Sequence, residues 1–449
     1  MSEICVVSGA GPVGCATALL LSKIPKLNIL VLEKREDMRG QADSELKSIN
    51  LALSERGRRL LRELGLEEQV LKNAVEMKGR AVHVGGKIAF QKYDEVNGTE
   101  CIYSVSRSDI NNILLDELEK NKDKIQVRFG KKVNLIEKIE RGKGLWIVFG
   151  DSEKVFAKVM IGCDGAYSSV REAMSRFVRM NISRQYIQMG YMELSIPCKT
   201  PGVFALEPHN ALHIWPREEE SHMMLIALPN IDGSFTATLF APFPTLLQIS
   251  QSEDEFKGFM NTHFQECLPY LDSSHGKAHP LFTVNIEPWN LESLAVLIGD
   301  AAHTQVPFFG QGMNAGLEDA FQLVQTLKQS NFNWDLTVPT FTKSRQPCGW
   351  AITQLSLENY EDMHTNSASF FHRKILQIEG FLSRVLRGRL LLPLYYQVAF
   401  TNIPYDEILK SKKQRELLLR RTLQGLLITS LSLSAFVLFK YPRAYLKNS

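Results

Sequence analysis

Short apolar runs recur along the chain and are separated by longer amphipathic stretches. Residues 4–8 and 28–32 are mostly apolar, which is typical of strands that a parallel sheet buries on both faces. Residues 15–22, between these runs, predict a helix, so the first 75 residues are expected to be βαβ material. Two later runs, residues 159–163 and 294–298, are also apolar and predict further strands. The pattern therefore predicts an α/β fold.

The rest of the chain predicts a second sheet and a helical end. Strands are expected at residues 82–106, with Gly85 and Gly86 as a turn, at 127–159 and at 186–240, and helices at 108–120, capped by Ser108, and at 255–271. After residue 340 the pattern is mainly helical. We expect the sheet at 186–240 to form the floor of a ligand pocket.

A glycine-rich turn follows the first predicted strand. Gly9, Gly11 and Gly14 have G-x-G-x-x-G spacing, which permits a tight turn, a close approach to a pyrophosphate, and close packing of helix on strand. The helix that follows directs its N-terminal N–H groups at the phosphates. Glu33 ends the next predicted strand and is placed to accept hydrogen bonds from a ribose. NAD and the ADP half of FAD both suit this turn, and a tight turn without a ligand is the alternative.

Further motifs follow the later apolar runs. Asp164-Gly165-Ala166 follows the first run, Gly299-Asp300-Ala301-Ala302-His303 follows the second, and Gly310-Gln311-Gly312-Met313-Asn314 comes soon after. Together with the glycine-rich turn they resemble the FAD monooxygenase superfamily, which includes single-component aromatic hydroxylases such as para-hydroxybenzoate hydroxylase. A helix N-cap is the alternative for Asp300 alone. The combination favours FAD over NAD.

The resemblance is more specific outside the cofactor motifs. Residues 48–54, 190–194, 212–217 and 307–314 resemble the kynurenine 3-monooxygenase family, and the likeness extends from residue 4 to about residue 405. It implies a Rossmann-like FAD-binding domain of the para-hydroxybenzoate hydroxylase type, an inserted β-sheet substrate domain, and a C-terminal helical region with a membrane anchor. The implied divisions are 1–75, 100–180 and 285–340 for the FAD-binding domain, 76–99 and 181–284 for the substrate domain, 341–421 for the C-terminal helices and 422–449 for the anchoring tail.

The resemblance also implies cofactor contacts. These are Gly9, Gly11, Val13, Gly14, Leu32, Glu33, Lys34, Arg35, Ala52, Arg107, Val133, Asp164, Asp300, Met313 and Asn314. The implied reaction is the 3-hydroxylation of L-kynurenine, in tryptophan catabolism, by O2 and NADPH-reduced FAD through a hydroperoxide at flavin C4a. Because the flavin performs the oxidation, neither a catalytic triad nor a metal is expected, and His303 is expected to be structural. The chain has no second glycine-rich turn with a suitable acid, so NADPH is expected to bind transiently.

The implied substrate has an amino-acid head and a flat aminophenyl ketone, so its pocket needs a fixed cation and apolar walls. The resemblance places Arg80 and Tyr93 on the carboxylate and adds Asn359 and Tyr395 as further contacts. Phe240 and Phe308 are candidate walls. The alternatives are a solvated surface position for the arginine and ordinary core packing for Tyr395 and the two phenylalanines.

Composition restricts other functions. The formal net charge is only +3 over 449 residues, which argues against bulk binding of nucleic acid. Seven scattered cysteines without a C-x-x-C pair predict reduced thiols rather than disulfides or a zinc site. A signal peptide is not expected, because the first apolar run leads directly into the nucleotide fold.

An uncharged segment, residues 423–439, lies near the C-terminus between basic flanks. It is at the lower edge of the length of a bilayer span, and serines dilute its apolar character. A marginal span, an interfacial helix and a buried helix all stay open. The resemblance implies attachment to the mitochondrial outer membrane, with the enzyme facing the cytosol.

Two other functions stay open. One is a different aromatic hydroxylase of the same superfamily. The other is a non-catalytic carrier with the flavoprotein fold, like the Rab escort and dissociation-inhibitor proteins. The presence of Glu33, Asp164 and Asp300 argues against the carrier, because these acids are the polar groups expected of an intact FAD site.

Overall fold

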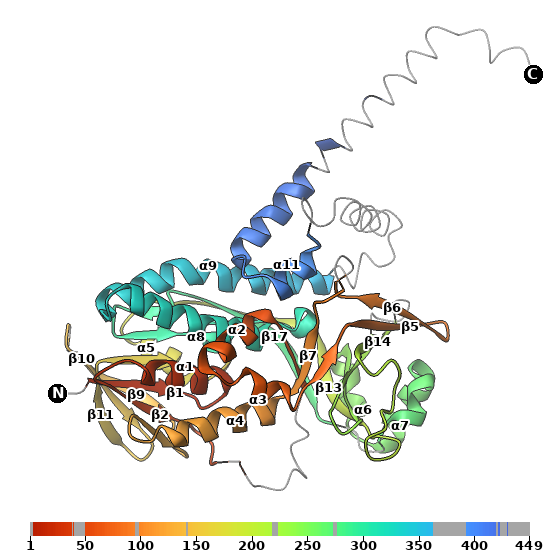
Figure 1. The fold of residues 1–449 in the computed structure, drawn as a ribbon, viewed down its shortest axis with the longest axis horizontal. Helices are drawn as coiled ribbons and strands as arrows, with labels where there is room; N and C mark the ends of the chain where they lie inside the picture. The colour runs from red at the N-terminus through yellow and green to blue at the C-terminus, as the bar shows by residue number, and fades with distance from the viewer. Residues whose placement is uncertain are drawn as a thin grey trace, which may run out of the picture.

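The computed structural model describes residues 3–37, 39, 50–94, 98–140, 142–217, 223–272, 276–361, 392–418, 421, 422 and 429. Within these residues the strands form one six-stranded sheet, one eight-stranded sheet and two three-stranded sheets. Figure 1 shows the six-stranded sheet and its helices in one half of the molecule and the eight-stranded sheet in the other, with α9 above α8 in this view.

The six-stranded sheet has the order β18–β19–β12–β1–β2–β8, and its neighbours are parallel except for β18 and β19. Its strands are β1 (Glu3–Ser8), β2 (Leu27–Leu32), β8 (Ile125–Arg128), β12 (Val159–Gly162), β18 (Asn290–Leu291) and β19 (Ala295–Leu297). Apolar side chains of this sheet share one core with those of α1 (Pro12–Ser22), α4 (Arg107–Lys120) and α8 (Gly312–Gln329). This burial explains the continuous apolar runs. It confirms the four strands predicted from them, each within one residue at either end.

Two antiparallel three-stranded sheets lie beside this core. One contains β9 (Val133–Glu140), β10 (Gly144–Phe149) and β11 (Glu153–Ala157), and the other contains β3 (Asn50–Leu53), β4 (Val75–Met77) and β7 (Ile102–Ser106). The short helices in this half are α2 (Glu55–Leu64), α3 (Glu67–Leu71) and α5 (Ser169–Met174).

The predicted cap of the helix at 108–120 was wrong. Helix α4 begins at Arg107, and Ser106 is the residue in extended conformation before it. The Ser106 hydroxyl accepts a hydrogen bond from the Asp109 N–H at 3.2 Å, which satisfies a donor that the first turn leaves free. Both serines are good caps, so the choice depended on where β7 ends.

The eight-stranded sheet has the order β20–β17–β13–β16–β15–β14–β5–β6. Its strands are β5 (Gly79–Val84), β6 (Lys87–Lys92), β13 (Asn181–Ile196), β14 (Ala211–Arg217), β15 (Met223–Pro229), β16 (Phe235–Pro242), β17 (Ala278–Glu287) and β20 (His303–Thr304). Gly85 and Gly86 form the predicted turn between β5 and β6, both with positive φ. The parallel pairing of β5 with β14 brings Arg80 into the sheet opposite Leu212. Segments far apart in the chain therefore share one sheet face.

One face of this sheet packs on α6 (Phe243–Ile249) and α7 (Glu253–His263) around a separate apolar core. The single helix predicted at 255–271 was wrong. Helix α7 ends before Phe264, and a short 3₁₀ helix, η1 (Gln265–Tyr270), follows it. Pro269 lies in this second segment, where its missing N–H prevents a continuous α-helical ladder.

The C-terminal part contains α9 (Trp334–Glu361), α11 (Leu394–Phe400) and a helical stretch at residues 405–418. Among the described residues, no helix combines the length and the apolar character that crossing a membrane requires. The predicted anchoring segment at 423–439 lies outside the described residues, apart from residue 429.

Candidate functional site

The three glycines of the first turn have the three different surroundings that a pyrophosphate site requires. A Cβ on Gly9, where φ is +101°, would lie 2.5 Å from the Cys163 carbonyl oxygen. A Cβ on Gly14 would overlap the Gly9 carbonyl. Nothing lies within 4 Å of the Cβ position of Gly11, which is the residue before the first turn of α1. The turn therefore leaves open space only where a phosphate must approach the backbone.

Glu33 lies buried just after β2, beside this turn. Its carboxylate accepts hydrogen bonds from the Ala10 N–H at 2.8 Å and from the Arg35 N–H at 3.0 Å. Burial opposes ionisation, but these bonds and the Arg35 charge hold the pKa of Glu33 below its usual value. The carboxylate is thus kept ionised as a hydrogen-bond acceptor at the edge of the turn.

The later motifs meet at the same edge of the sheet. Asp164 follows β12, and one of its oxygens accepts from the Ser169 N–H at 2.7 Å, while its other oxygen is buried without a partner. Val13 of α1 lies against both Gly299 and Gly316, since a Cβ on either glycine would contact its side chain. The carboxyl ends of parallel strands form the usual ligand crevice of such sheets, so these motifs face one site.

The Asp300 side chain is exposed to solvent, but protein groups packed around it still desolvate its carboxyl. These surroundings raise the pKa of the Asp300 carboxyl, while the charges of His303 and Arg107 oppose the rise. Arg107, the first residue of α4, also acts on Glu193 of β13, where burial raises the pKa of the carboxyl and the arginine opposes the shift. Arg107 is therefore an electrostatic neighbour of both the cofactor turn and the sheet.

Helix α8 begins beside β3. Asn314 is fully buried, donates to the Ala52 carbonyl at 2.7 Å and accepts from the Ser54 N–H at 2.9 Å. Its side chain therefore fixes the start of α8 against β3. Met313, its neighbour, packs on the main core.

The other predicted cofactor residues lie close to these. Leu32 ends β2 and is buried, Lys34 and Arg35 follow Glu33 and are exposed, and Val133 begins β9 and is buried. The Lys131 N–H, two residues before Val133, donates to the Glu33 carbonyl at 2.7 Å.

These residues fit FAD. The open Gly11 and the start of α1 suit the pyrophosphate, and Glu33 suits the ribose. The exposed Asp300 carboxylate suits the ribityl hydroxyls, and the unpartnered oxygen of Asp164 is a further free acceptor at this edge.

Arg80, Tyr93 and Tyr395 come together at one end of the eight-stranded sheet. The Arg80 guanidinium carbon lies 4.3 Å from the Tyr395 ring centroid and 5.7 Å from that of Tyr93. The two rings are stacked, with centroids 5.4 Å apart. Burial opposes the charge of Arg80, but the two tyrosines raise the pKa of its guanidinium. Its Nε is buried without a hydrogen-bond partner. A fixed cation thus lies beside a pair of stacked aromatic rings, and the alternative of a solvated surface arginine was wrong.

Asn359 lies at a different point, on α9, and donates to the Phe308 carbonyl at 3.0 Å. The Phe308 ring lies 5.3 Å from that of Phe240, and the Phe309 ring stacks on Tyr395 at 6.0 Å. Aromatic rings therefore extend from the Arg80 group towards Asn359. Phe240 is buried in an apolar cluster against which Phe308 packs, and its role as a pocket wall stays a prediction.

Sequence analysis missed a buried ionic cluster beneath these groups. Arg56 binds Glu318 at 2.8 Å and donates to the Val398 carbonyl at 2.9 Å, close to Tyr395 in the chain. Arg345 of α9 binds Glu318 at 2.7 Å and Asp319 at 2.6 Å. The cluster joins α2, α8, α9 and the segment that carries Tyr395. Charged residues in amphipathic helices usually face solvent, so periodicity alone did not reveal it.

A family model described as FAD binding domain matches residues 1–356. Solved structures of low sequence identity show the same fold. A probable FAD-dependent monooxygenase from Pseudomonas aeruginosa, pqsL, has a TM-score of 0.66 at 17% identity and covers 81% of this chain and 97% of its own. The tetrameric form of 2-methyl-3-hydroxypyridine-5-carboxylic acid oxygenase has a TM-score of 0.66 at 17% identity, with coverages of 89% and 96%. The family model and the site define an FAD-binding protein, and the solved structures show that its fold is one that FAD-dependent monooxygenases also have.

Curated relatives narrow the class. Proteins named kynurenine 3-monooxygenase include one from Sus scrofa, 38% identical over 414 residues (89% of this chain and 84% of the relative), and one from Anopheles gambiae, 36% identical over 438 residues (95% and 88%). Another, from Saccharomyces cerevisiae, is 35% identical over 468 residues and covers 98% of this chain and 99% of the relative. The chain belongs to the kynurenine 3-monooxygenase family.

Proposed function

We propose that the protein hydroxylates L-kynurenine at C3. The observation that carries this proposal is the Arg80 guanidinium beside the stacked Tyr93 and Tyr395 rings, at one end of a sheet face that also holds the phenyl ring of Phe240. An α-amino acid with a flat aromatic ketone matches a fixed cation followed by apolar walls. Family membership supports the same substrate.

In this proposal the chain binds and orients the substrate. Arg80 holds the carboxylate, the two tyrosines keep that cation in place, and Phe240 and Phe308 flank the aromatic ring. Bound FAD supplies the oxidising chemistry, with O2 as oxidant and NADPH as the source of electrons. The start of α8, held by Asn314 against β3, directs free N–H groups at the flavin side of the site.

We also propose that residues 422–449 attach the protein to the mitochondrial outer membrane, with the catalytic part facing the cytosol. The uncharged segment at 423–439 and its basic flanks support this.

The test is NADPH consumption by the purified, FAD-loaded protein with and without L-kynurenine, together with product identification. Stimulated consumption and 3-hydroxykynurenine are expected. Stimulation by a different aromatic acid, and none by kynurenine, would instead select another hydroxylase of the class. A protein that holds no flavin would support the non-catalytic carrier.

A further inference from the structure

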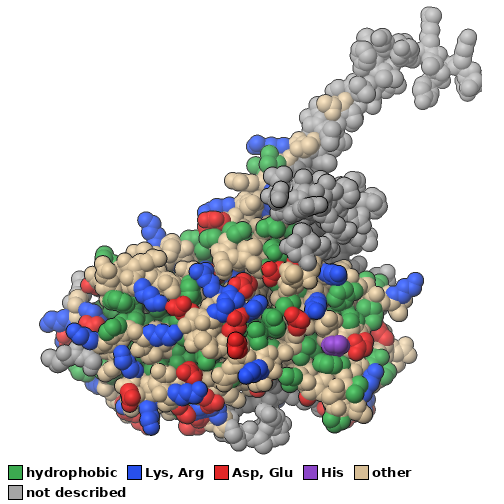
Figure 2. All heavy atoms as spheres, viewed as in Figure 1, with side chains coloured by type: hydrophobic (Ala, Val, Ile, Leu, Met, Phe, Trp, Pro, Cys, Tyr) green, Lys and Arg blue, Asp and Glu red, His purple; other side chains and the backbone are tan. Residues whose placement is uncertain are grey.

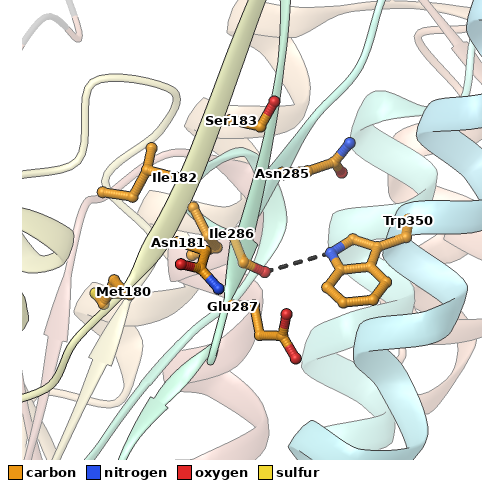
Figure 3. A pocket seen from close by; sticks show the side chains of 8 residues that line it. All are labelled: Met180, Asn181, Ile182, Ser183, Asn285, Ile286, Glu287 and Trp350. Atoms are coloured by element: carbon orange, nitrogen blue, oxygen red, sulfur yellow. Dashed lines mark hydrogen bonds between the residues drawn. The ribbon is translucent and has the colours of Figure 1, made fainter.

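A groove of about 430 Å³ lies on the side of β13 and β17 that faces α9 (Figure 3). Asn181, Ser183, Asn285 and Glu287 supply most of its polar groups. Trp350 of α9 forms its wall and donates to the Ile286 carbonyl at 3.3 Å. None of the predicted substrate or cofactor residues lines this groove.

Asn285, which lines the groove, and His303, opposite it in the sheet, each have a buried polar atom without a hydrogen-bond partner. These atoms are Asn285 Oδ1 and His303 Nδ1. Asn285 lines the groove, but its oxygen is turned away from solvent. Leaving a buried polar atom without a partner is unfavourable, so native proteins pair such atoms with each other or with ordered water.

The two atoms belong to neighbouring side chains. Asn285 and His303 are directly opposite each other in the antiparallel pair of β17 and β20. Side chains in that relation lie on the same sheet face, with their Cβ atoms about 4.5–5.5 Å apart. The Cδ2 edge of the His303 ring faces α9, because a Cβ on Gly349 would lie 2.9 Å from Cδ2. Nδ1 is on the other side of the ring, so it is the sheet register, and not the helix, that places His303 beside Asn285, which lines the groove.

His303 is itself part of the buried ionic cluster. Its Nε2 binds Asp319 at 2.6 Å, and the same carboxylate oxygen accepts from the Gly299 N–H at 2.9 Å. His303 is 1% exposed and stacks on Trp289. The His303–Asp319 pair therefore lies directly beneath the turn that carries Asp300.

We propose that an ordered water in the inner end of the groove bridges Asn285 Oδ1 and His303 Nδ1, and that the His303–Asp319 pair exchanges protons with solvent through it. One water satisfies both atoms in either state of the histidine. It donates to Asn285, and it donates to a neutral Nδ1 or accepts from a protonated one. Gln305, two residues from His303, has a buried Nε2 without a partner that can supply a third bond.

The charged groups that face His303 come from three elements: Asp319 from α8, Arg345 from α9 through Asp319, and Asp300 from the cofactor turn. A proton that reaches His303 comes from water in the groove, and His303 later releases it to the same water. The cofactor turn thus exchanges protons by a route that does not pass Arg80. This inference depends on the fold and not on the proposed substrate.

The test uses the FAD-loaded protein. Its crystal structure should show a water within hydrogen-bonding distance of both atoms. In D2O, exchange of the histidine C2 hydrogen, followed by mass spectrometry, reports solvent access to each ring. Asn285→Leu keeps the bulk but removes the acceptor, so His303 exchange should slow by at least about tenfold, because exchange then needs local opening.

Asn285→Ser retains a polar atom and should exchange at His303 like the parent. Asn181→Leu alters the mouth of the groove but not Asn285, so it serves as the matched control. His213, buried in another part of the sheet, should exchange alike in all variants. Unchanged His303 exchange in a folded Asn285→Leu variant would overturn the proposal. If that variant does not fold, a parent crystal structure with no water at this position overturns it equally.

Discussion

Arg80 is the residue on which substrate recognition depends most. It is the charge beside the two stacked tyrosines, and Met keeps much of the bulk of its stem. Loss of a charge-assisted hydrogen bond is worth roughly 1.5–3 kcal/mol. Arg80→Met should therefore raise the Kd for kynurenine about 10- to 150-fold, measured by titration of the flavin absorbance.

Two controls accompany this measurement. FAD content should be unchanged, because the cofactor motifs lie elsewhere. Decarboxylated kynurenine should bind the parent and Arg80→Met with similar Kd, since it lacks the group that the arginine holds. A large difference between the two proteins for that analogue would show that Arg80 has another role.

His213 on β14 should make stability depend on pH. It is fully buried, its ring faces His83 at 2.9 Å and the Pro208 carbonyl at 3.1 Å, and burial lowers the pKa of its imidazole to about 4. An unfolded histidine has a pKa near 6.5. Between these values the unfolded chain binds more protons, so the free energy of unfolding falls as the pH drops from about 6.5 to about 4, by at most roughly 1.4 kcal/mol per pH unit.

Urea unfolding at a series of pH values in this window measures that slope. His83 adds to it in the same direction, because burial lowers the pKa of that half-buried imidazole as well. His213→Gln keeps hydrogen-bonding groups but does not titrate, so its slope should be shallower. An equal slope in the parent and the variant would mean that His213 is not the group responsible.

At the level of elements, two glycines of the turn between β1 and α1 should have different roles: Gly14 matters for the stability of the fold and Gly11 for the binding of FAD. A Cβ on Gly14 would overlap the Gly9 carbonyl, so Gly14→Ala should destabilise the fold by about 1–3 kcal/mol. Gly11 has open space around it and an ordinary φ of −76°, so Gly11→Ala should cost about 1 kcal/mol or less. The methyl group that Gly11→Ala adds would instead point at the pyrophosphate and weaken FAD binding.

Thermal unfolding of the FAD-free proteins and FAD titration distinguish the two effects. The expected result is a large loss of stability only for Gly14→Ala and a loss of affinity without much loss of stability for Gly11→Ala. Tight FAD binding by Gly11→Ala would mean that the pyrophosphate does not lie against this residue.

Two helix ends were not predicted correctly from the sequence pattern. Ser106 and Ser108 both suit a cap, and the end of β7 selected the first. The predicted helix at 255–271 combined α7 with η1, because the apolar spacing continues across Phe264 although the backbone does not. Both differences concern a terminus, where neighbouring strands and a proline decide the geometry.

At the scale of the whole molecule, the C-terminal tail should decide where the protein resides. Deleting residues from Thr422 onward should release it from mitochondrial membranes into the soluble fraction. Six leucines and two phenylalanines lie in residues 423–439, and each contributes up to about 1.5–3 kcal/mol when fully buried. The proposed FAD and kynurenine residues precede the cut, so bound flavin should be retained.

Carbonate extraction followed by detection in pellet and supernatant measures this outcome. A truncated protein that stays in the carbonate-resistant pellet would place the attachment in another part of the chain. Over the face shown in Figure 2, basic and acidic side chains are interspersed, and no large basic patch offers an alternative means of attachment there.

The sequence by itself determined the β1–α1–β2 unit, the two later strands β12 and β19 of the same sheet, and the glycine-rich turn. Burial on both faces of a parallel strand and the conformation of a tight turn are local demands, so they leave a local pattern. The order of the cofactor motifs pointed to FAD, the resemblance of residues outside those motifs pointed to the family, and the comparisons confirmed both.

Only the tertiary structure decided how distant side chains combine. The pairing of β5 with β14 and the placement of α11 bring Arg80 to Tyr395, and the folding of α8 on α9 brings Asp319 to Arg345. Each of those residues taken alone has the pattern of an ordinary surface or core position. The contacts between them depend on the closure of long loops and on packing across elements, and neither leaves a periodic signal in the chain.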